Sequence, residues 1–207
     1  MTDPQWLVWA NRIRAIAAAG RTYTRDPFDR ERYEQLQQIA AEILTAHTDT
    51  DVDTLYELID GDFGYPTPKV DVRGVVLREG RILLVREKLD DGRWTLPGGW
   101  ADIYDSPSES VEREIEEESG FEARAVRLLA VYDRQKWPHP PHPNYTYILF
   151  FLCEITGGQP TTSLETGGVG WFPPDALPEL STGRVLPEQI ARLVELARHP
   201  EWPTDFD

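Results

Sequence analysis

Three glutamates near the middle of the chain have the spacing of a metal site. Glu114, Glu117 and Glu118 stand at positions i, i+3 and i+4, so a helix would bring their carboxylates onto one face. Three like charges on one face repel one another, and Arg113 reaches only Glu117 well, at i+4. A divalent cation would offset all three charges, and hard oxygen ligands in this number suit Mg²⁺ or Mn²⁺. A solvated acidic face, as expected of an acidic chain, is the alternative.

The sequence around these glutamates predicts a helix over residues 107–119 with both ends specified. Ser106 is a good N-cap residue, Pro107 suits the first helical position, and Glu109 completes a capping box with Ser106. Gly120 stands where a left-handed residue ends a helix. The three carboxylates are therefore expected on a helix with a fixed beginning and end.

A glycine turn precedes this helix. Pro97-Gly98-Gly99 lets the chain turn sharply and lets a carbonyl or amide group approach a ligand closely. Together, the turn and the helix resemble the Nudix hydrolase motif, G-x5-E-x7-R-E-U-x-E-E-x-G-U, in which U is an apolar residue. The match begins at Gly99, continues at the required spacing with Arg113-Glu114-Ile115 and Glu117-Glu118, and closes with Gly120-Phe121.

Two positions depart from the motif. Asp105 replaces its first glutamate, and Tyr104 stands where a small glycine is usual. Asp105 either joins an outer ligand shell through water or is a simple turn aspartate, and the sequence leaves both interpretations open.

The resemblance implies roles for individual residues. Glu114, Glu117 and Glu118 would be metal ligands, and the carbonyl group of Gly98 would be a further ligand. Arg113 would orient the carboxylates by ion pairing. Bound cations of this kind cancel phosphate charge and lower the pKa of a bound water, which makes a hydroxide nucleophile near neutral pH.

Further residues are expected to accept a proton or to contact the substrate. As the general base we favour Glu114 over Glu165, which precedes a Gly-Gly pair and is otherwise a plain exposed-loop residue. Asp133 and Arg134 would fix a phosphate or the second moiety of the substrate, unless they form a surface ion pair. Tyr145 would stack on a base, unless it packs within its strand.

The resemblance implies a metal-dependent hydrolase. Water would attack one phosphorus of a nucleoside diphosphate linked to another moiety, X, and give a nucleoside monophosphate and phosphorylated X. ADP-ribose, CDP-choline and UDP-sugars are the substrate types. The alternatives are a nucleoside triphosphate phosphohydrolase that releases pyrophosphate, including one for oxidised nucleotides, and a Nudix module that senses a nucleotide without cleaving it.

Helical patterns precede the segment that carries these residues. Apolar residues recur at spacings of three and four from Gln5 to Ala19, with Gly20 as a stop. Asp26-Pro27 opens a second pattern that continues to Ile43, and a shorter helix is expected around Val52–Ile59. Such short helices with one apolar stripe need a surface to pack on, which is the next domain, a second subunit or both.

The prolines of residues 64–68 mark a domain boundary, because they break helical periodicity. We expect a helical domain over residues 1–64, for packing or dimerisation, and a Nudix hydrolase domain over 65–207. Strands interrupted by helices indicate the α/β class, and the resemblance implies a Nudix α/β/α sandwich with a mixed sheet after a small all-helical domain. Strands are predicted over 70–77, 82–87, 125–131, 145–153 and 169–172, and a last helix over 187–198.

Composition restricts partners and location. The 207 residues include 36 acidic and 21 basic side chains, for a net charge of −15, so nucleic acid and anionic membranes would be repelled. A small nucleotide is the expected partner, together with a second subunit, because Trp6, Leu7 and Trp9 offer more apolar surface than a small helical unit hides. Cys153 is the only cysteine, which excludes a disulfide framework. Without an apolar span or a signal-peptide pattern, the expected location is the cytoplasm.

Overall fold

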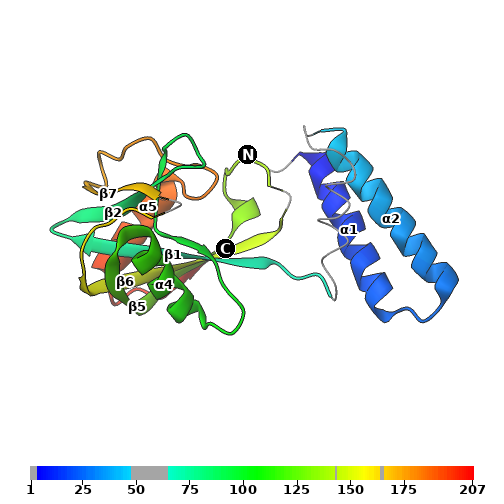
Figure 1. Cartoon of the computed structure of the whole chain (residues 1–207), viewed down its shortest axis with the longest axis horizontal. Coiled ribbons are helices and arrows are strands. Elements are labelled where there is room, and N and C mark those ends of the chain that lie inside the picture. Colours follow the sequence, from blue (N-terminus) through cyan, green and yellow to red (C-terminus); the bar gives the residue numbers. More distant parts are fainter. Residues whose placement is uncertain (1–3, 48–64, 143, 164–165) are drawn as a thin grey trace. The chain divides into compact units, whose positions relative to one another are not determined.

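The computed structural model describes residues 4–47, 65–142, 144–163 and 166–207, and the chain divides into two compact units (Figure 1). One unit contains the helices α1 (Gln5–Tyr23) and α2 (Pro27–Thr45). The other comprises Lys69–Pro140 and Thr146–Asp207 and contains the sheet. The glutamates with metal-site spacing lie in this second unit, the catalytic unit.

The two N-terminal helices pack on each other through small residues. Asp26 caps α2 as predicted, since its carboxylate accepts from the backbone N–H groups of the first turn. The prediction that Gly20 ends the first helix is wrong, because α1 continues to Tyr23. Gly20 instead permits close packing, since a Cβ atom there would lie 2.3 Å from the ring of Tyr33. The shared core consists of Leu7, Ala10, Ala41 and Leu44.

Large apolar side chains remain exposed on these helices. Trp9 is 55% exposed and Ile16 is 60% exposed, so the apolar stripe predicted for α1 is only partly covered by α2. The helix predicted over residues 52–59 lies outside the described residues. No helix in the described ranges has the length and apolar character needed to cross a bilayer.

The catalytic unit is built on an eight-stranded mixed sheet. The strand order is β3-β2-β1-β6-β5-β8, with β4 paired to β1 and β7 paired to β2. The pairs β1–β6 and β5–β8 are parallel, and the other pairs are antiparallel. The elements are β1 (Lys69–Arg78), β2 (Arg81–Glu87), β3 (Trp94–Thr95), β4 (Gly98–Trp100), α4 (Pro107–Ser119), β5 (Phe121–Asp133), η1 (Arg134–Lys136), β6 (Thr146–Gly158), β7 (Thr166–Phe172), α5 (Pro187–Arg198) and β8 (Asp205–Phe206).

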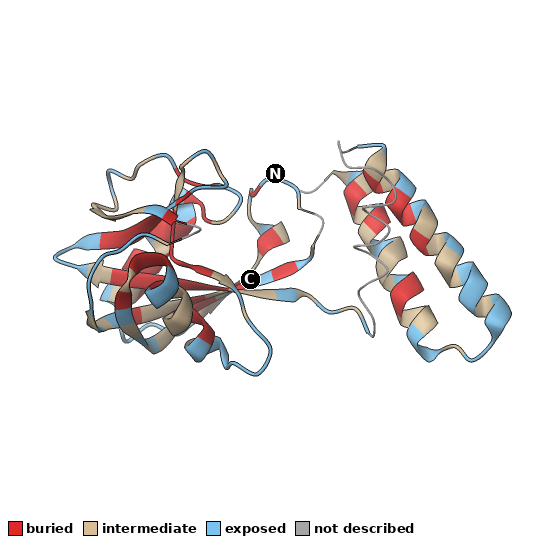
Figure 2. Ribbon diagram, in the orientation of Figure 1, coloured by how far each residue is buried: buried red, intermediate tan, exposed pale blue. Residues whose placement is uncertain are grey.

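Helices cover both faces of this sheet. α4 packs through Ile115 into a core that contains Val72, whereas α5 packs through Ile190 into a core that contains Val75. Residues 72 and 75 point to opposite faces because side chains alternate along a strand. Figure 2 shows the buried residues concentrated along the strands between the two helices. The α/β/α sandwich with a mixed sheet is therefore confirmed.

The predicted strands and the last helix are present. The turn between β1 and β2 uses Glu79 and Gly80, both with positive φ (53° and 75°), as a tight hairpin requires. β5 extends beyond both of its predicted ends, β6 begins one residue later than predicted and continues to Gly158, and α5 has the predicted bounds. The short strands β3, β4 and β8 have two or three residues each, too few to produce a periodic pattern.

Candidate active site

The ends of α4 are those that the sequence predicts. The Ser106 hydroxyl accepts from the Glu109 N–H at 3.3 Å, and the Glu109 carboxylate accepts from the Ser106 N–H at 2.8 Å. Gly120 ends the helix in the left-handed region, with φ 76°. Gly74 of β1 leaves room for Ile115, whose Cδ1 would lie 2.6 Å from a Cβ atom at position 74. α4 is thus held at both ends and against the sheet.

The Gly98–Gly99 turn lies against two of the three glutamates. The Gly98 N–H donates to Oε2 of Glu118 at 2.8 Å. Gly98 has φ 143°, and a Cβ atom there would lie 2.0 Å from the Val72 carbonyl oxygen, so only glycine fits. A Cβ atom on Gly99 would lie 3.1 Å from Oε2 of Glu114. The structure therefore brings Glu114, Glu118 and Gly98 together, as the sequence predicts.

Glu118 is buried and forms no ion pair with the described residues. It is 5% exposed, and burial raises its pKa to about 8, although Arg73 and the Gly98 N–H oppose the shift. In the described part of the chain, Gly98 donates its hydrogen bond and no ion pair reaches its carboxylate. Burial also raises the pKa of Glu114, against the effect of Arg113. Carboxylates in such surroundings favour a bound cation.

Arg113 contacts four carboxylates. Its guanidinium nitrogens lie 3.0 Å from Asp102, 3.3 Å from Asp105, 3.2 Å from Glu114 and 3.4 Å from Glu117. The expectation that Arg113 reaches only Glu117 of the three glutamates well is therefore wrong, because its Nη1 also lies 3.2 Å from Glu114. The loop before α4 brings Asp102 and Asp105 to the same guanidinium. Asp105, which replaces the first glutamate of the motif, forms an ion pair in this network.

The donor set suits a divalent cation. Glu114 and Glu118 border the same glycine turn, and the Glu117 side chain is 60% exposed. Among the residues that the structure describes, no three acidic, histidine or cysteine side chains already converge as metal ligands. Arg113 binds Glu114 and Glu117, whereas Glu118 binds the Gly98 N–H, which holds the carboxylates apart. Carboxylate oxygens supplemented by waters are the ligands that Mg²⁺ and Mn²⁺ prefer, so these residues fit such an ion.

Asp133 and Arg134, predicted to contact substrate, make local contacts at the end of β5. The Asp133 carboxylate accepts from the N–H of Gln135 at 3.0 Å. Arg134 is buried, and its Nη2 donates to the carbonyl oxygens of Pro140, at 2.8 Å, and Gly183, at 3.2 Å. These bonds tie two loops together.

Tyr145 and Glu165 are the other two predicted site residues. Tyr145 is half exposed and groups with the helical unit. Glu165 lies outside the described residues. The next residue, Thr166, donates its hydroxyl to the carbonyl oxygen of Glu118 at 2.7 Å, so β7 begins beside the last turn of α4.

Sequence reasoning missed Arg73. Its guanidinium is buried and donates to both carboxylate oxygens of Asp71, at 2.6 and 2.9 Å, and to the Leu96 carbonyl oxygen at 3.2 Å. Burial opposes the charged guanidinium, but the carboxylates of Asp71, Glu118 and Glu87 raise its pKa above the ordinary value. An arginine inside an apolar strand, two residues from an aspartate on the same face, is the signal that could have found it.

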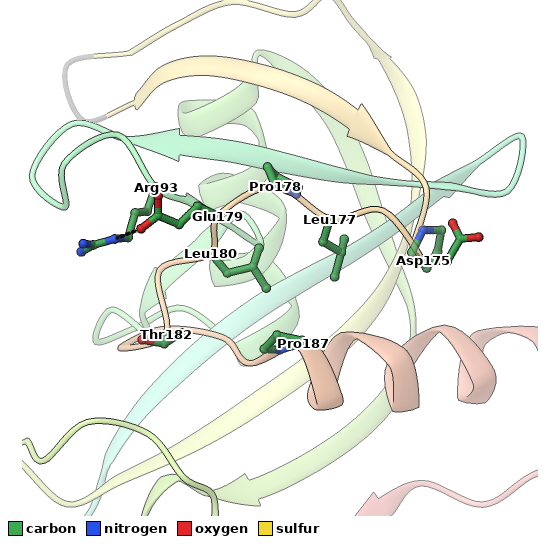
Figure 3. A pocket seen from close by; sticks show the side chains of 9 residues that line it. Arg93, Asp175, Leu177, Pro178, Glu179, Leu180, Thr182 and Pro187 are labelled. Carbon is green, nitrogen blue, oxygen red and sulfur yellow. Dashed lines mark hydrogen bonds and ion pairs between the residues drawn. The ribbon is translucent and has the colours of Figure 1, made fainter.

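An open cavity of about 650 Å³ lies along the loop between β7 and α5 (Figure 3). None of the residues predicted for catalysis, metal binding or substrate contact is among the described residues that line it. The Arg93 guanidinium at its rim already pairs with Glu179 at 3.0 Å and with Asp90 at 2.7 Å. The lining consists of Arg93, Pro174, Asp175, Leu177, Pro178, Glu179, Leu180, Thr182 and Pro187.

Both units match known families. Residues 4–59 match the family described as "UDP-X-like, N-terminal oligomerisation domain", and residues 67–193 match the NUDIX domain. The second match spans more than half of the chain and includes the glycine turn and α4. The chain belongs to the Nudix family, and it is a Nudix hydrolase of the pyrophosphatase type.

Individual relatives resemble this chain over most or all of its length. The chain is 48% identical over 203 residues to the putative ADP-ribose pyrophosphatase YjhB of Bacillus subtilis (strain 168), and the match covers 98% of this chain and 97% of that protein. The crystal structure of a UDP-X diphosphatase covers 100% of both chains, with 35% identity and a TM-score of 0.65. The crystal structure of an ADP-ribose pyrophosphatase from Streptococcus suis 89-1591 covers 68% of this chain and 100% of that chain, with 39% identity and a TM-score of 0.63.

Proposed function

We propose that this protein hydrolyses the pyrophosphate bond of nucleoside diphosphate derivatives of the ADP-ribose, CDP-choline or UDP-sugar type. The products are a nucleoside monophosphate and phosphorylated X. The observation that carries the proposal is the buried carboxylate of Glu118, which accepts from the Gly98 N–H, lies beside Glu114 and forms no ion pair with the described residues. The similarity to an ADP-ribose pyrophosphatase and to a UDP-X diphosphatase supports this substrate class.

In this proposal Glu114, Glu117, Glu118 and the Gly98 carbonyl group hold Mg²⁺ or Mn²⁺. The bound ion cancels phosphate charge and lowers the pKa of a bound water. Arg113 fixes the orientation of Glu114 and Glu117 through its ion pairs. Its further pairs with the loop before α4 keep the guanidinium in place, which supports a positioning role.

We assign the general base to Glu114, with Glu165 as the alternative. Glu114 lies against the Gly99 backbone, and Thr166, next to Glu165, bonds to α4. The variant Glu165→Gln separates the two, because Glu165 is not a proposed metal ligand: loss of kcat with unchanged Mn²⁺ binding would make it the base, and unchanged kcat would leave Glu114. On the substrate side we propose Asp133, Arg134 and Tyr145, with Arg134 acting through the loop that it holds.

A substrate screen tests the proposed activity. Purified protein with Mg²⁺ or Mn²⁺ is incubated with ADP-ribose, CDP-choline, UDP-sugars and nucleoside triphosphates, and the products are separated by ion-exchange chromatography. We expect a nucleoside monophosphate and phosphorylated X from at least one diphosphate derivative. Pyrophosphate released from a triphosphate alone would contradict the proposal, and binding without any cleavage would indicate a sensor module.

We also propose that the N-terminal domain, residues 1–64, forms a homodimer through its exposed apolar side chains. Trp9 and Ile16 are exposed on α1, and the match of residues 4–59 to an oligomerisation domain supports this role. Sedimentation at micromolar concentration should give a dimer for the wild-type chain and a monomer for Ile16→Glu. A matched charge on the other helix, Gln38→Glu on α2, should leave the dimer intact. Equal sedimentation of all three proteins would contradict the interface.

A further inference from the structure

A diphosphate substrate brings negative charge to a chain whose own net charge is −15. Arginine is the usual partner of phosphate oxygens, because its planar guanidinium donates several hydrogen bonds at once. The two arginines beside the α4 carboxylates are already engaged. Arg73 donates to Asp71 and Leu96, and Arg113 contacts four carboxylates. A cation that faces the substrate must come from another residue.

Arg184 forms an ion pair whose two ends differ in exposure. Its Nη2 lies 3.1 Å from Oε2 of Glu87, at the end of β2. The Glu87 side chain is 4% exposed, whereas the Arg184 side chain is 37% exposed. Oε1 of Glu87 is buried and has no hydrogen-bond partner among the described residues. The pair thus has a buried carboxylate as its anchor and a guanidinium that is partly open to solvent.

This ion pair lies next to the last turn of α4. Glu87 is opposite Thr166 in the pairing of β2 with β7, and the Thr166 hydroxyl donates to the Glu118 carbonyl oxygen at 2.7 Å. The charge of Glu87 also contributes to the raised pKa values of Arg73 and Glu118. Glu87 is therefore a neighbour of the buried carboxylate proposed to hold the metal.

The turn that carries Arg184 is fixed from several sides. The Arg184 N–H donates to the Ser181 carbonyl oxygen at 2.9 Å, and the Ser181 N–H donates to the Trp94 carbonyl oxygen at 2.8 Å. Arg134 donates to the Gly183 carbonyl oxygen at 3.2 Å. A side chain on such a turn keeps its position when the substrate arrives, which lowers the entropic cost of binding.

An ion pair with one buried end contributes little to stability, because desolvation of the buried carboxylate offsets the attraction between the charges. The unpartnered oxygen of Glu87 adds a further cost, so a functional role accounts for the pair better than stability does. We propose that Arg184 binds a phosphate group of the nucleoside diphosphate derivative, and that Glu87 is the positioning residue that holds its guanidinium. This inference rests on the proposed function and names a phosphate contact of that site.

The test compares Arg184→Gln with Arg184→Lys and with Arg93→Gln. Arg93 is a matched control, since its side chain is 38% exposed and also pairs with carboxylates, on a neighbouring loop. For Arg184→Gln we expect KM, and the Kd of the non-hydrolysable α,β-methylene-ADP measured by calorimetry with Mg²⁺, to rise by about tenfold or more. The value of kcat should change by less than about threefold, because the contact is made in both ground and transition states. Arg184→Lys should recover part of the affinity, and Arg93→Gln should match the wild type.

Glu87 provides the second arm, because Arg184→Gln alone leaves a buried carboxylate without its partner and could impair folding. Glu87→Gln should raise the same Kd in the same direction but less. The double variant Glu87→Gln/Arg184→Gln has no orphaned charge, and its Kd should equal that of Arg184→Gln, since the first residue acts through the second. Thermal unfolding of each variant checks the fold.

The outcomes separate this inference from the proposed function. If the wild type cleaves diphosphate derivatives and the double variant folds with unchanged KM and Kd, the phosphate contact is wrong and the function stands. If Glu87→Gln weakens Mn²⁺ binding without changing the Kd of α,β-methylene-ADP, the positioning role is wrong. If the wild type cleaves none of the derivatives, the proposed function fails, and calorimetry still decides whether Arg184 binds a nucleoside diphosphate.

Discussion

The catalytic unit contains two groups of buried polar side chains that are assembled in different ways. In the first group, the glycine turn and α4 over residues 98–120, hydrogen-bond partners are close in sequence: Gly98 and Glu118 are 20 residues apart. In the loops around residues 134–140 and 181–189, His139 bonds across 43 residues to Thr182 and across 50 residues to Gln189. The first group is local and the second joins distant segments.

The two groups also differ in charge. The Glu118 carboxylate is buried with a backbone N–H as its donor and forms no direct ion pair with the described residues. His139, in contrast, has its Nδ1 2.8 Å from the Thr182 carbonyl oxygen and its Nε2 3.1 Å from the Gln189 amide nitrogen, a pattern that suits the neutral ring. We therefore assign the carboxylates of the local group to metal binding, and the hydrogen bonds of the long-range group to holding the two loops together. Substitutions in the first should affect turnover and substitutions in the second should affect stability.

The largest effect is expected for Glu118→Gln. The amide keeps the shape of the side chain and can accept from the Gly98 N–H, but it removes the negative charge. We expect turnover to fall by more than about tenfold, because transition-state charge loses its stabilisation. The free energy of unfolding without metal, measured in urea at pH 7, should not fall, because burial already disfavours the charged carboxylate.

Glu116→Gln is the matched control, since Glu116 is exposed on the same helix. It removes the same charge from the chain and should change turnover by less than about twofold. If both variants lose turnover equally, net charge rather than a metal site would explain the loss. If Glu118→Gln instead unfolds the chain, the separation of chemistry from stability in α4 would be wrong.

A smaller effect, on stability, is expected from His139 as the pH falls. Burial lowers the pKa of His139 to about 4, with Arg134 and Arg73 acting in the same direction and the Thr182 carbonyl and Asp71 against it. Between pH 6.5 and 4 the unfolded chain therefore binds a proton that the folded chain does not. The contribution of His139 to the free energy of unfolding is fully present above pH 6.5. It decreases toward pH 4 by on the order of 3 kcal/mol.

Urea unfolding of the wild type and His139→Asn at several pH values from 7.5 to 4.5 measures this contribution. Asparagine can donate to the Thr182 carbonyl oxygen but does not titrate. Both proteins are measured in the same Mg²⁺ buffer, so that the carboxylates of α4 contribute equally. The variant should be less stable at pH 7.5 and should lose less stability on acidification. Equal pH dependence in the two proteins would show that His139 takes up its proton in the folded state.

The same contrast explains which features could be predicted from the sequence. α4, its caps and its three glutamates were predictable because each determinant lies within a few residues of its partner. The bounds of α5 follow from Pro187 and a regular apolar pattern for the same reason. Arg184 and its partner Glu87 are almost a hundred residues apart, and neither position has a local pattern that reveals the other. Gly20 shows the converse error, because its packing against Tyr33 outweighs its tendency to end a helix.

The smallest effect concerns backbone strain from a positive φ at a non-glycine residue. Such a residue is present in the glycine turn and α4 group, over residues 98–120, and absent from the described residues of the loops around His139. Tyr104, in the loop before α4, has φ 74° and is 99% exposed, and it stands where a small glycine is usual. A non-glycine residue in this region costs about 1–2 kcal/mol, and glycine returns part of this as entropy of the unfolded chain. Tyr104→Gly should therefore raise the free energy of unfolding by roughly 0.5–1 kcal/mol.

Tyr104→Ala is the control for this last substitution, because it removes the ring and keeps a Cβ atom at positive φ. When thermal unfolding of the wild type and both variants is measured, Tyr104→Gly should gain stability and Tyr104→Ala should not. Asp102 and Asp105, on either side of Tyr104, remain paired with Arg113 in both variants, so turnover should stay within about twofold of the wild type. If Tyr104→Ala stabilises as much as Tyr104→Gly, the cost comes from the exposed ring and not from the backbone. In that case the loop before α4 would be as free of backbone strain as the loops that His139 holds.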